Sequence, residues 1–130
     1  MAVMENFGKL SAKFSHCADF QVVYIEEAHP SERPNFTGNV DIQTHKNLED
    51  RVRASKMLDT VRSNTDKFNI TVDLMDNQAS VTYAALPERL YVVLDGEIIY
   101  EGGQGPFDYH LEELESLLES FKSKPIRQTA

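Results

Sequence analysis

The fold is decided by one stretch of sequence, Phe20-Gln21-Val22-Val23-Tyr24-Ile25-Glu26-Glu27-Ala28-His29-Pro30. The β-branched and aromatic residues 20–25 are typical of a buried strand. The strand ends in two carboxylates and an imidazole, and ligands of open α/β sheets bind just outside the carboxyl ends of the strands. Pro30 disfavours helical backbone at His29, so we expect that imidazole on an extended turn. The stretch therefore predicts a small-molecule site near Glu27 and His29.

The composition argues against a nucleic-acid-binding or membrane-spanning protein. The 130 residues form one domain in which 21 acidic and 13 basic residues give a net charge of −8. Such a surface repels phosphate, so we expect no nucleic acid and no anionic membrane surface as a partner. No apolar run approaches the roughly 20 residues of a membrane-spanning helix. We therefore expect the chain as given to be soluble and cytoplasmic.

Cysteine and histidine usage excludes two further classes of site. Cys17 is the only cysteine, so an internal disulfide is impossible and a reducing compartment is expected. No pair of the four histidines has the spacing of metal ligands on one helix or loop, so we expect no metal.

Periodicity predicts an alternation of helices and strands around this stretch. Helical spacing of apolar residues begins at Val3 and ends at Phe14, and a second strand is expected over 69–74, followed by a short helix or turn over 77–83. Asp95-Gly96 between two β-rich runs predicts a hairpin. The expected order is α-β-α-β-(short α)-β-β-α.

Capping residues indicate where the two remaining helices begin. Asn47, with Asp50 three residues later, predicts the start of a helix. Its expected apolar face is formed by Leu48, Val52, Met57, Leu58 and Val61. Asp108 is expected to cap the last helix, whose inward residues would be Leu111, Leu114, Leu117, Leu118 and Phe121.

Six longer motifs, taken in order, resemble the catalytic domain of one family, the iodothyronine deiodinases. They are Tyr24–Ser31, Asp41-Ile42 with His45, Leu48–Arg51, Asp73–Asn77, Tyr83–Val92 and Gly102–Pro106. The similarity extends from about Met1 to Ser120.

The resemblance implies an α/β fold of the thioredoxin-like type with a mixed sheet that lacks its first core strand. Residues 1–123 would be an incomplete deiodinase catalytic domain with a deiodinase-type insertion at about 29–47, and residues 124–130 a disordered tail. The family's selenocysteine nucleophile would lie a few residues upstream of the position that resembles Met1. We therefore expect the chain alone to be inactive, and its reading frame to continue upstream through a UGA codon.

The resemblance also implies an oxidoreductase that removes iodine from thyroid hormones such as thyroxine. It would use a thiol reductant as cosubstrate and hold no bound cofactor. His29 and Arg89 would clamp the iodothyronine substrate. Glu27 and His45 would belong to a hydrogen-bonded relay that moves protons, with Tyr24 as a supporting catalytic group.

The remaining expectations concern the assembly of the protein and its alternative functions. By resemblance the protein is a homodimer, and its catalytic domain faces the cytosol from a membrane anchor preceding these residues. Glu32-Arg33-Pro34-Asn35-Phe36 departs from the pattern of the family, so outer-ring and inner-ring attack both stay open. One alternative is a nucleophile-free module that binds iodothyronines without turnover. A weaker alternative is a thiol protein acting through Cys17.

Overall fold

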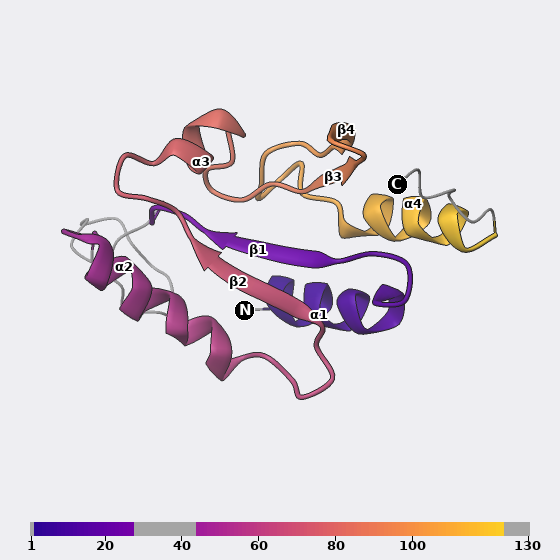
Figure 1. Cartoon of the computed structure of the whole chain (residues 1–130), viewed down its shortest axis with the longest axis horizontal. Coiled ribbons are helices and arrows are strands. Elements are labelled where there is room, and N and C mark those ends of the chain that lie inside the picture. Colours follow the sequence, from indigo (N-terminus) through magenta and orange to yellow (C-terminus); the bar gives the residue numbers. More distant parts are fainter. Residues whose placement is uncertain (1, 28–43, 124–130) are drawn as a thin grey trace.

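The chain folds into a mixture of helices and short strands (Figure 1), so the predicted α/β class is confirmed. The computed structural model describes residues 2–27 and 44–123. Its elements are α1 (Ala2–Phe14), β1 (Phe20–Tyr24), α2 (Leu48–Ser55), the 3-10 helix η1 (Lys56–Thr60), β2 (Phe68–Val72), α3 (Gln78–Thr82), β3 (Tyr91–Leu94), β4 (Glu97–Glu101) and α4 (Leu111–Ser123). Their order is the predicted one. Most of the expected insertion at 29–47, and the expected tail at 124–130, lie outside the described residues.

The strands form two separate pairs within the described ranges. β1 and β2 are parallel, with Phe20 opposite Phe68 and Tyr24 opposite Val72. β3 and β4 form an antiparallel hairpin. Each strand is therefore paired along one edge in this part of the chain. The hairpin turns at Asp95 and Gly96, where φ is 52° and 79°. These positive values are those that a two-residue hairpin turn demands, so the Asp-Gly signal is confirmed.

Aromatic and leucine side chains at one end of the β1–β2 pair form the core. Phe7 lies edge-on to Phe20 and to Phe68, with ring centroids 5.6 and 5.7 Å apart. Phe14 is fully buried. The cluster consists of Phe7, Leu10, Phe14, Phe20, Phe68, Leu90, Leu114 and Leu118. It joins α1, α4 and the first residue of each parallel strand, which fixes where the strands begin.

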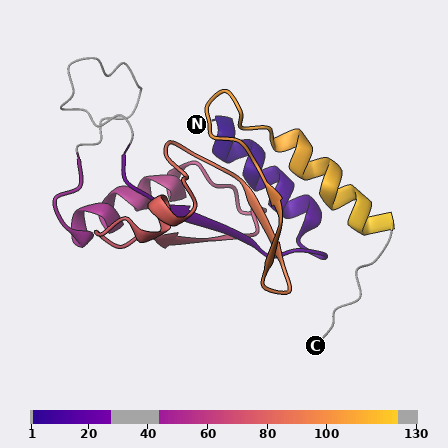
Figure 2. The same ribbon diagram turned by 90° about the horizontal axis from the view of Figure 1, so that it is seen from above.

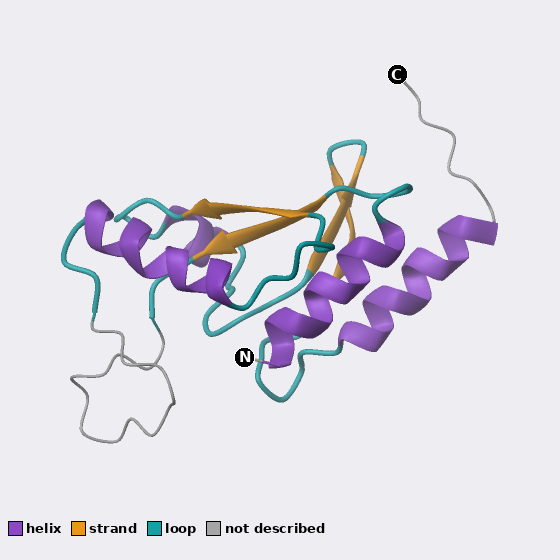
Figure 3. Cartoon of the chain, turned by 90° about the horizontal axis from the view of Figure 1, so that it is seen from below, coloured by secondary structure: helices purple, strands orange, loops and turns teal. Residues whose placement is uncertain are grey.

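Helices α1 and α4 lie side by side, as two views show (Figures 2 and 3). The Lys13 ammonium bridges them, 3.2 Å from a Glu115 carboxylate oxygen and 3.1 Å from one of Glu119. All three side chains are about half exposed, so this network contributes little to stability. In the described part of the chain, no helix combines the length and apolar character needed to cross a bilayer.

Gly8 lets α1 approach the loop that precedes β2. A Cβ atom at this position would lie 2.5 Å from the Asp66 carboxylate, well inside contact distance. That carboxylate is held in place because it accepts a 2.8 Å hydrogen bond from the Ser63 backbone N–H. One turn along the helix, the buried Ser11 hydroxyl donates to the Gly8 carbonyl and accepts from the Lys67 backbone N–H. Gly8 and Ser11 on α1 thus allow this loop to pack against the helix and to form a hydrogen bond with it.

The orientation of helix α2 differs from the one that the sequence predicted. Asn47 caps it as predicted, accepting a 2.8 Å hydrogen bond from the Asp50 backbone N–H. The expected apolar face, however, is largely exposed, since only Leu58 on the following turn is buried among its members. Arg51 and Ser55 are buried instead. The apolar pattern of α2 therefore does not mark its inward face.

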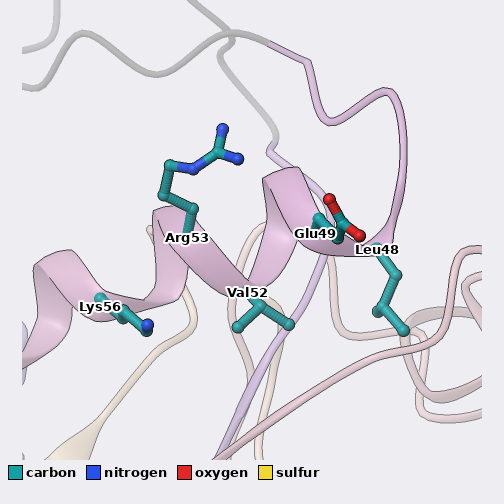
Figure 4. A pocket seen from close by; sticks show the side chains of 5 residues that line it. All are labelled: Leu48, Glu49, Val52, Arg53 and Lys56. Atoms are coloured by element: carbon teal, nitrogen blue, oxygen red, sulfur yellow. The ribbon is translucent and has the colours of Figure 1, made fainter.

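The outer surface of α2 carries a pocket lined by residues that include Leu48 and Val52 (Figure 4). These two side chains point to the same side of the helix, away from Arg53. They are 41% and 38% exposed.

The start of helix α4 also differs from the prediction. It begins at Leu111, three residues after Asp108. The Asp108 backbone N–H donates to the Gln104 carbonyl, so this residue still belongs to the preceding turn. The predicted cap at Asp108 is therefore wrong, although Leu114 and Leu118 are buried as expected.

The close approach at Gly8 can be tested by a double-mutant cycle. Gly8→Ala is expected to be neutral or destabilising by up to about 1 kcal/mol, because the Asp66 carboxylate must move away from the new methyl group and lose its hydrogen bond from Ser63. In an exposed helix the same change would stabilise by about 1 kcal/mol. In an Asp66→Ala background Gly8→Ala is expected to be neutral or stabilising. Urea unfolding of the four proteins measures these free energies, and a stabilising Gly8→Ala on its own would contradict the contact.

Candidate functional site

The carboxyl ends of the two parallel strands meet at the end of the molecule where α2 lies (Figures 1 and 3). The pairing continues one step beyond the strands, because the Asp73 backbone N–H donates to the Tyr24 carbonyl at 2.8 Å. The loops that leave β1 and β2 therefore start side by side. This is the edge at which the sequence predicts a ligand site.

Three of the five predicted site residues come together here. The Tyr24 hydroxyl forms a very short hydrogen bond with the Glu27 carboxylate. The same hydroxyl lies 3.3 Å from Nε2 of His45, and the two rings are 5.5 Å apart between centroids. His45 is only 7% exposed, and Tyr24 and Glu27 are half-buried. Tyr24 is thus the middle member of a chain that connects a carboxylate to an imidazole.

Arg51 extends this chain, and the sequence analysis gave it no role. Its Nε lies 2.9 Å from Nδ1 of His45. Its Nη1 donates to the Leu74 carbonyl at 2.8 Å and to the Asp73 carbonyl at 3.4 Å. The only signal in the sequence was its place within the motif Leu48–Arg51, because its contacts with the two carbonyl groups join residues more than 20 positions apart in the chain. We call Glu27, Tyr24, His45 and Arg51 the relay cluster.

Asp73 fixes the backbone to which Arg51 is bound. Its carboxylate is 5% exposed and accepts hydrogen bonds of 2.9, 3.0 and 2.9 Å from the backbone N–H groups of Leu74, Ala79 and Ser80. A buried carboxylate is stable only with such partners. It holds the start of α3 against the end of β2, which keeps the carbonyl groups near Arg51 in position.

Burial sets the protonation states of the relay cluster. It raises the pKa of Tyr24 well above the ordinary value of 10.0, and the hydrogen bond to Glu27 raises it further. Burial also lowers the pKa of His45 below 6.5, and the Arg51 charge adds to this effect. At neutral pH the hydroxyl is therefore protonated and the imidazole neutral. The raised pKa holds the proton on Tyr24, which donates a hydrogen bond to Glu27.

Arg89 belongs to a different network. It precedes β3, and its guanidinium donates to the carbonyl groups of Gly102 and Ala84 at 2.6 and 3.3 Å. It also forms a 2.9 Å ion pair with Glu101 and lies over the Tyr91 ring. None of these partners is a member of the relay cluster. Arg89 thus fastens the base of the hairpin, and three of its N–H groups already have acceptors.

The predicted clamp cannot be placed as a pair, since His29 lies outside the described residues. The roles of His29, Arg89, Glu27, His45 and Tyr24 stay predictions. In the described part of the chain, no three His, Cys, Asp or Glu side chains gather as metal ligands would.

Comparisons with known proteins place the chain in a family. The family model "Iodothyronine deiodinase" matches residues 1–122. The chain is 41% identical over 116 residues to a type I iodothyronine deiodinase of Xenopus laevis, covering 89% of this chain and 45% of the relative. It is 39% identical over 125 residues to a thyroxine 5-deiodinase of Gallus gallus, covering 95% and 47%.

A third relative agrees with these two. It is a type II iodothyronine deiodinase of Petromyzon marinus, 43% identical over 117 residues, with 90% of this chain and 41% of the relative covered. The chain therefore spans less than half the length of the curated relatives it matches. With the family model matching almost the whole chain, this protein belongs to the iodothyronine deiodinase family.

Proposed function

We propose that this chain is part of an enzyme that removes iodine reductively from iodothyronines such as thyroxine. One observation carries the proposal: the Tyr24 hydroxyl contacts both the Glu27 carboxylate and the His45 imidazole at the carboxyl ends of two parallel strands. This hydrogen-bonded cluster lies in a chain that belongs to the deiodinase family. The names of its relatives, iodothyronine deiodinase and thyroxine 5-deiodinase, suggest the substrate class.

The reaction requires both electrons and a proton. The carbon–iodine bond breaks, a carbon–hydrogen bond forms, and iodine leaves as iodide. Two thiol molecules of a cosubstrate supply the two electrons and become one disulfide, and of the two protons they release, one is taken up at the ring carbon. By resemblance the nucleophile is a selenocysteine, which is not among these 130 residues.

The described residues would supply the proton and part of the binding site. The Tyr24 hydroxyl donates a hydrogen bond to Glu27 and lies beside His45, so the three side chains form a connected polar path for a proton relay. Arg89 uses three of its five N–H groups internally, which leaves donors for the charged end of an iodothyronine. We infer that His29 completes this clamp. Substrate positioned in this way would have its iodine aimed at the nucleophile.

The finer features of the fold and assembly are proposals as well. We infer a thioredoxin-like mixed sheet that contains both strand pairs and is completed by one further strand, because β1–β2 and β3–β4 each keep unpaired edges within the described ranges. A homodimer, a membrane anchor and a cytosol-facing catalytic domain follow from the family resemblance.

Tyr24→Phe tests the relay. This variant keeps the ring and removes only the hydroxyl, so we expect kcat for iodide release from thyroxine to fall about 100-fold with little change in KM. The assay uses the protein expressed from its complete transcript, with dithiothreitol as the reductant. Tyr91→Phe is the matched control because its hydroxyl donates to the Tyr83 carbonyl, outside the relay cluster.

Two results would contradict the proposals. Equal kcat values for Tyr24→Phe and Tyr91→Phe would exclude the relay. Wild-type protein that binds thyroxine but releases no iodide would exclude the enzyme and favour the alternative of a binding module.

Arg89→Gln tests the clamp. We expect thyroxine to bind about tenfold more weakly, since a charged donor near the amino acid end of the substrate is lost. Glu101→Gln is the control: it removes the ion-pair partner of Arg89 and keeps the guanidinium, so the affinity is expected to stay the same or rise. Calorimetric titration measures both. Unchanged affinity in Arg89→Gln would show that Arg89 only supports the hairpin.

A further inference from the structure

Arg51 is a buried cation whose hydrogen bonds lead into the relay cluster. It is 3% exposed. Among the described residues, no carboxylate forms an ion pair with it. A buried charge without an opposite charge is destabilising unless hydrogen bonds compensate, and here the acceptors are two carbonyl groups and an imidazole. These three acceptors therefore determine how the guanidinium is oriented.

The direction of each hydrogen bond follows from the chemistry of the guanidinium. Arginine stays protonated and has only donors. Since its Nε donates to Nδ1 of His45, that nitrogen must be the acceptor, and the neutral ring carries its proton on Nε2.

The tautomer of His45 determines the direction of the remaining two hydrogen bonds of the cluster. The Nε2–H group of His45 lies 3.3 Å from the Tyr24 oxygen and donates to it. The Tyr24 hydroxyl hydrogen is thereby left for Glu27, whose carboxylate oxygen accepts the hydrogen bond. All bonds run in one sense, from Arg51 through His45 and Tyr24 to Glu27.

We propose that Arg51 is a positioning residue that holds His45 in the Nε2–H tautomer and so makes Tyr24 the hydrogen-bond donor to Glu27. Because Nδ1 of His45 already accepts a hydrogen bond from Arg51, it cannot take up a proton, and the relay ends at His45. His45 then fixes the orientation of the Tyr24 hydroxyl by donating to its oxygen, and does not pass a proton through its own ring. The meaning for turnover rests on the proposed function, whereas the tautomer is a property of the resting protein.

The tautomer can be observed directly by NMR. In protein labelled with ¹⁵N-histidine, long-range proton–nitrogen spectra distinguish a protonated from an unprotonated ring nitrogen. We expect His45 to show a protonated Nε2 and an unprotonated Nδ1 at neutral pH. A His45→Gln variant assigns its signals among the four histidines. A proton on Nδ1 in the wild type would overturn the proposal, and this result requires no Arg51 variant.

Substitution of Arg51 provides the second test. Arg51→Met keeps a long stem but removes the charge and the donors, so Nδ1 should become partly protonated. Among the described residues, the groups that face His45 are Arg51 and Asp50 from α2, Tyr24 from β1, and Glu27. With the cation removed and the acids kept, the titration midpoint of His45 should rise by about one pH unit, a tenfold change in proton affinity. An unchanged tautomer and midpoint in folded Arg51→Met would overturn the proposal.

Two further variants separate positioning from a structural role. Arg51→Lys keeps a cationic donor, so it should retain the Nε2–H tautomer and a low midpoint; loss of both would overturn the proposal even if Arg51→Met fails to fold. Arg53→Met is the matched control from the same helix, because its side chain is 74% exposed. It should leave the His45 tautomer unchanged, because it makes no contact with the ring and only its ion pair with Asp50 is lost. Absent iodide release with the expected spectra would count against the proposed function alone.

Discussion

Parallel pairing of β1 with β2 is the constraint on which the candidate site depends. Because the strands run in the same direction, the loops that follow Tyr24 and Val72 leave the sheet at one edge. The backbone bond from Asp73 to Tyr24 then fixes their register at that edge. A slip of one residue would turn the Tyr24 side chain to the opposite face and separate it from His45. The core residues at the far end of both strands hold this register.

The two buried or half-buried arginines of the site region show two different uses of the same side chain. Arg89 has an acidic partner, an aromatic ring beneath it and two carbonyl acceptors, which is a complete set of contacts for holding a hairpin together. Arg51 has no described acidic partner, and one of its donors points at a titratable ring. The first arrangement is sufficient as a structural support. In the second arrangement, the charge of Arg51 determines which ring nitrogen of His45 carries the proton.

The sequence predicted the parts of the structure that local pattern determines. The order of the elements, the Asp95-Gly96 hairpin and the Asn47 cap depend on residues close together in the chain. Glu27 and His29 were found because they follow the end of a clear strand. Tyr24, His45 and Arg89, and the roles of all five residues, came from family resemblance and not from pattern.

Arg51 could not be predicted in the same way. The apolar spacing of α2 placed Leu48 and Val52 inside, whereas both are exposed. What decides the orientation of this helix is a set of acceptors at Asp73, Leu74 and His45, and their position becomes known only when the strands are paired. The same limit applies to Asp108, where a local cap signal was outweighed by a turn that ends later.

The polar inner surface of α2 has a consequence for how accurately the helix is seated. Apolar contacts are indifferent to orientation, so a helix held by them can roll by several degrees at little cost. Hydrogen bonds weaken steeply when they are bent. A helix anchored by the guanidinium of Arg51 is therefore restrained against rolling as well as against moving away, and the angular tolerance of the His45 ring is correspondingly narrow.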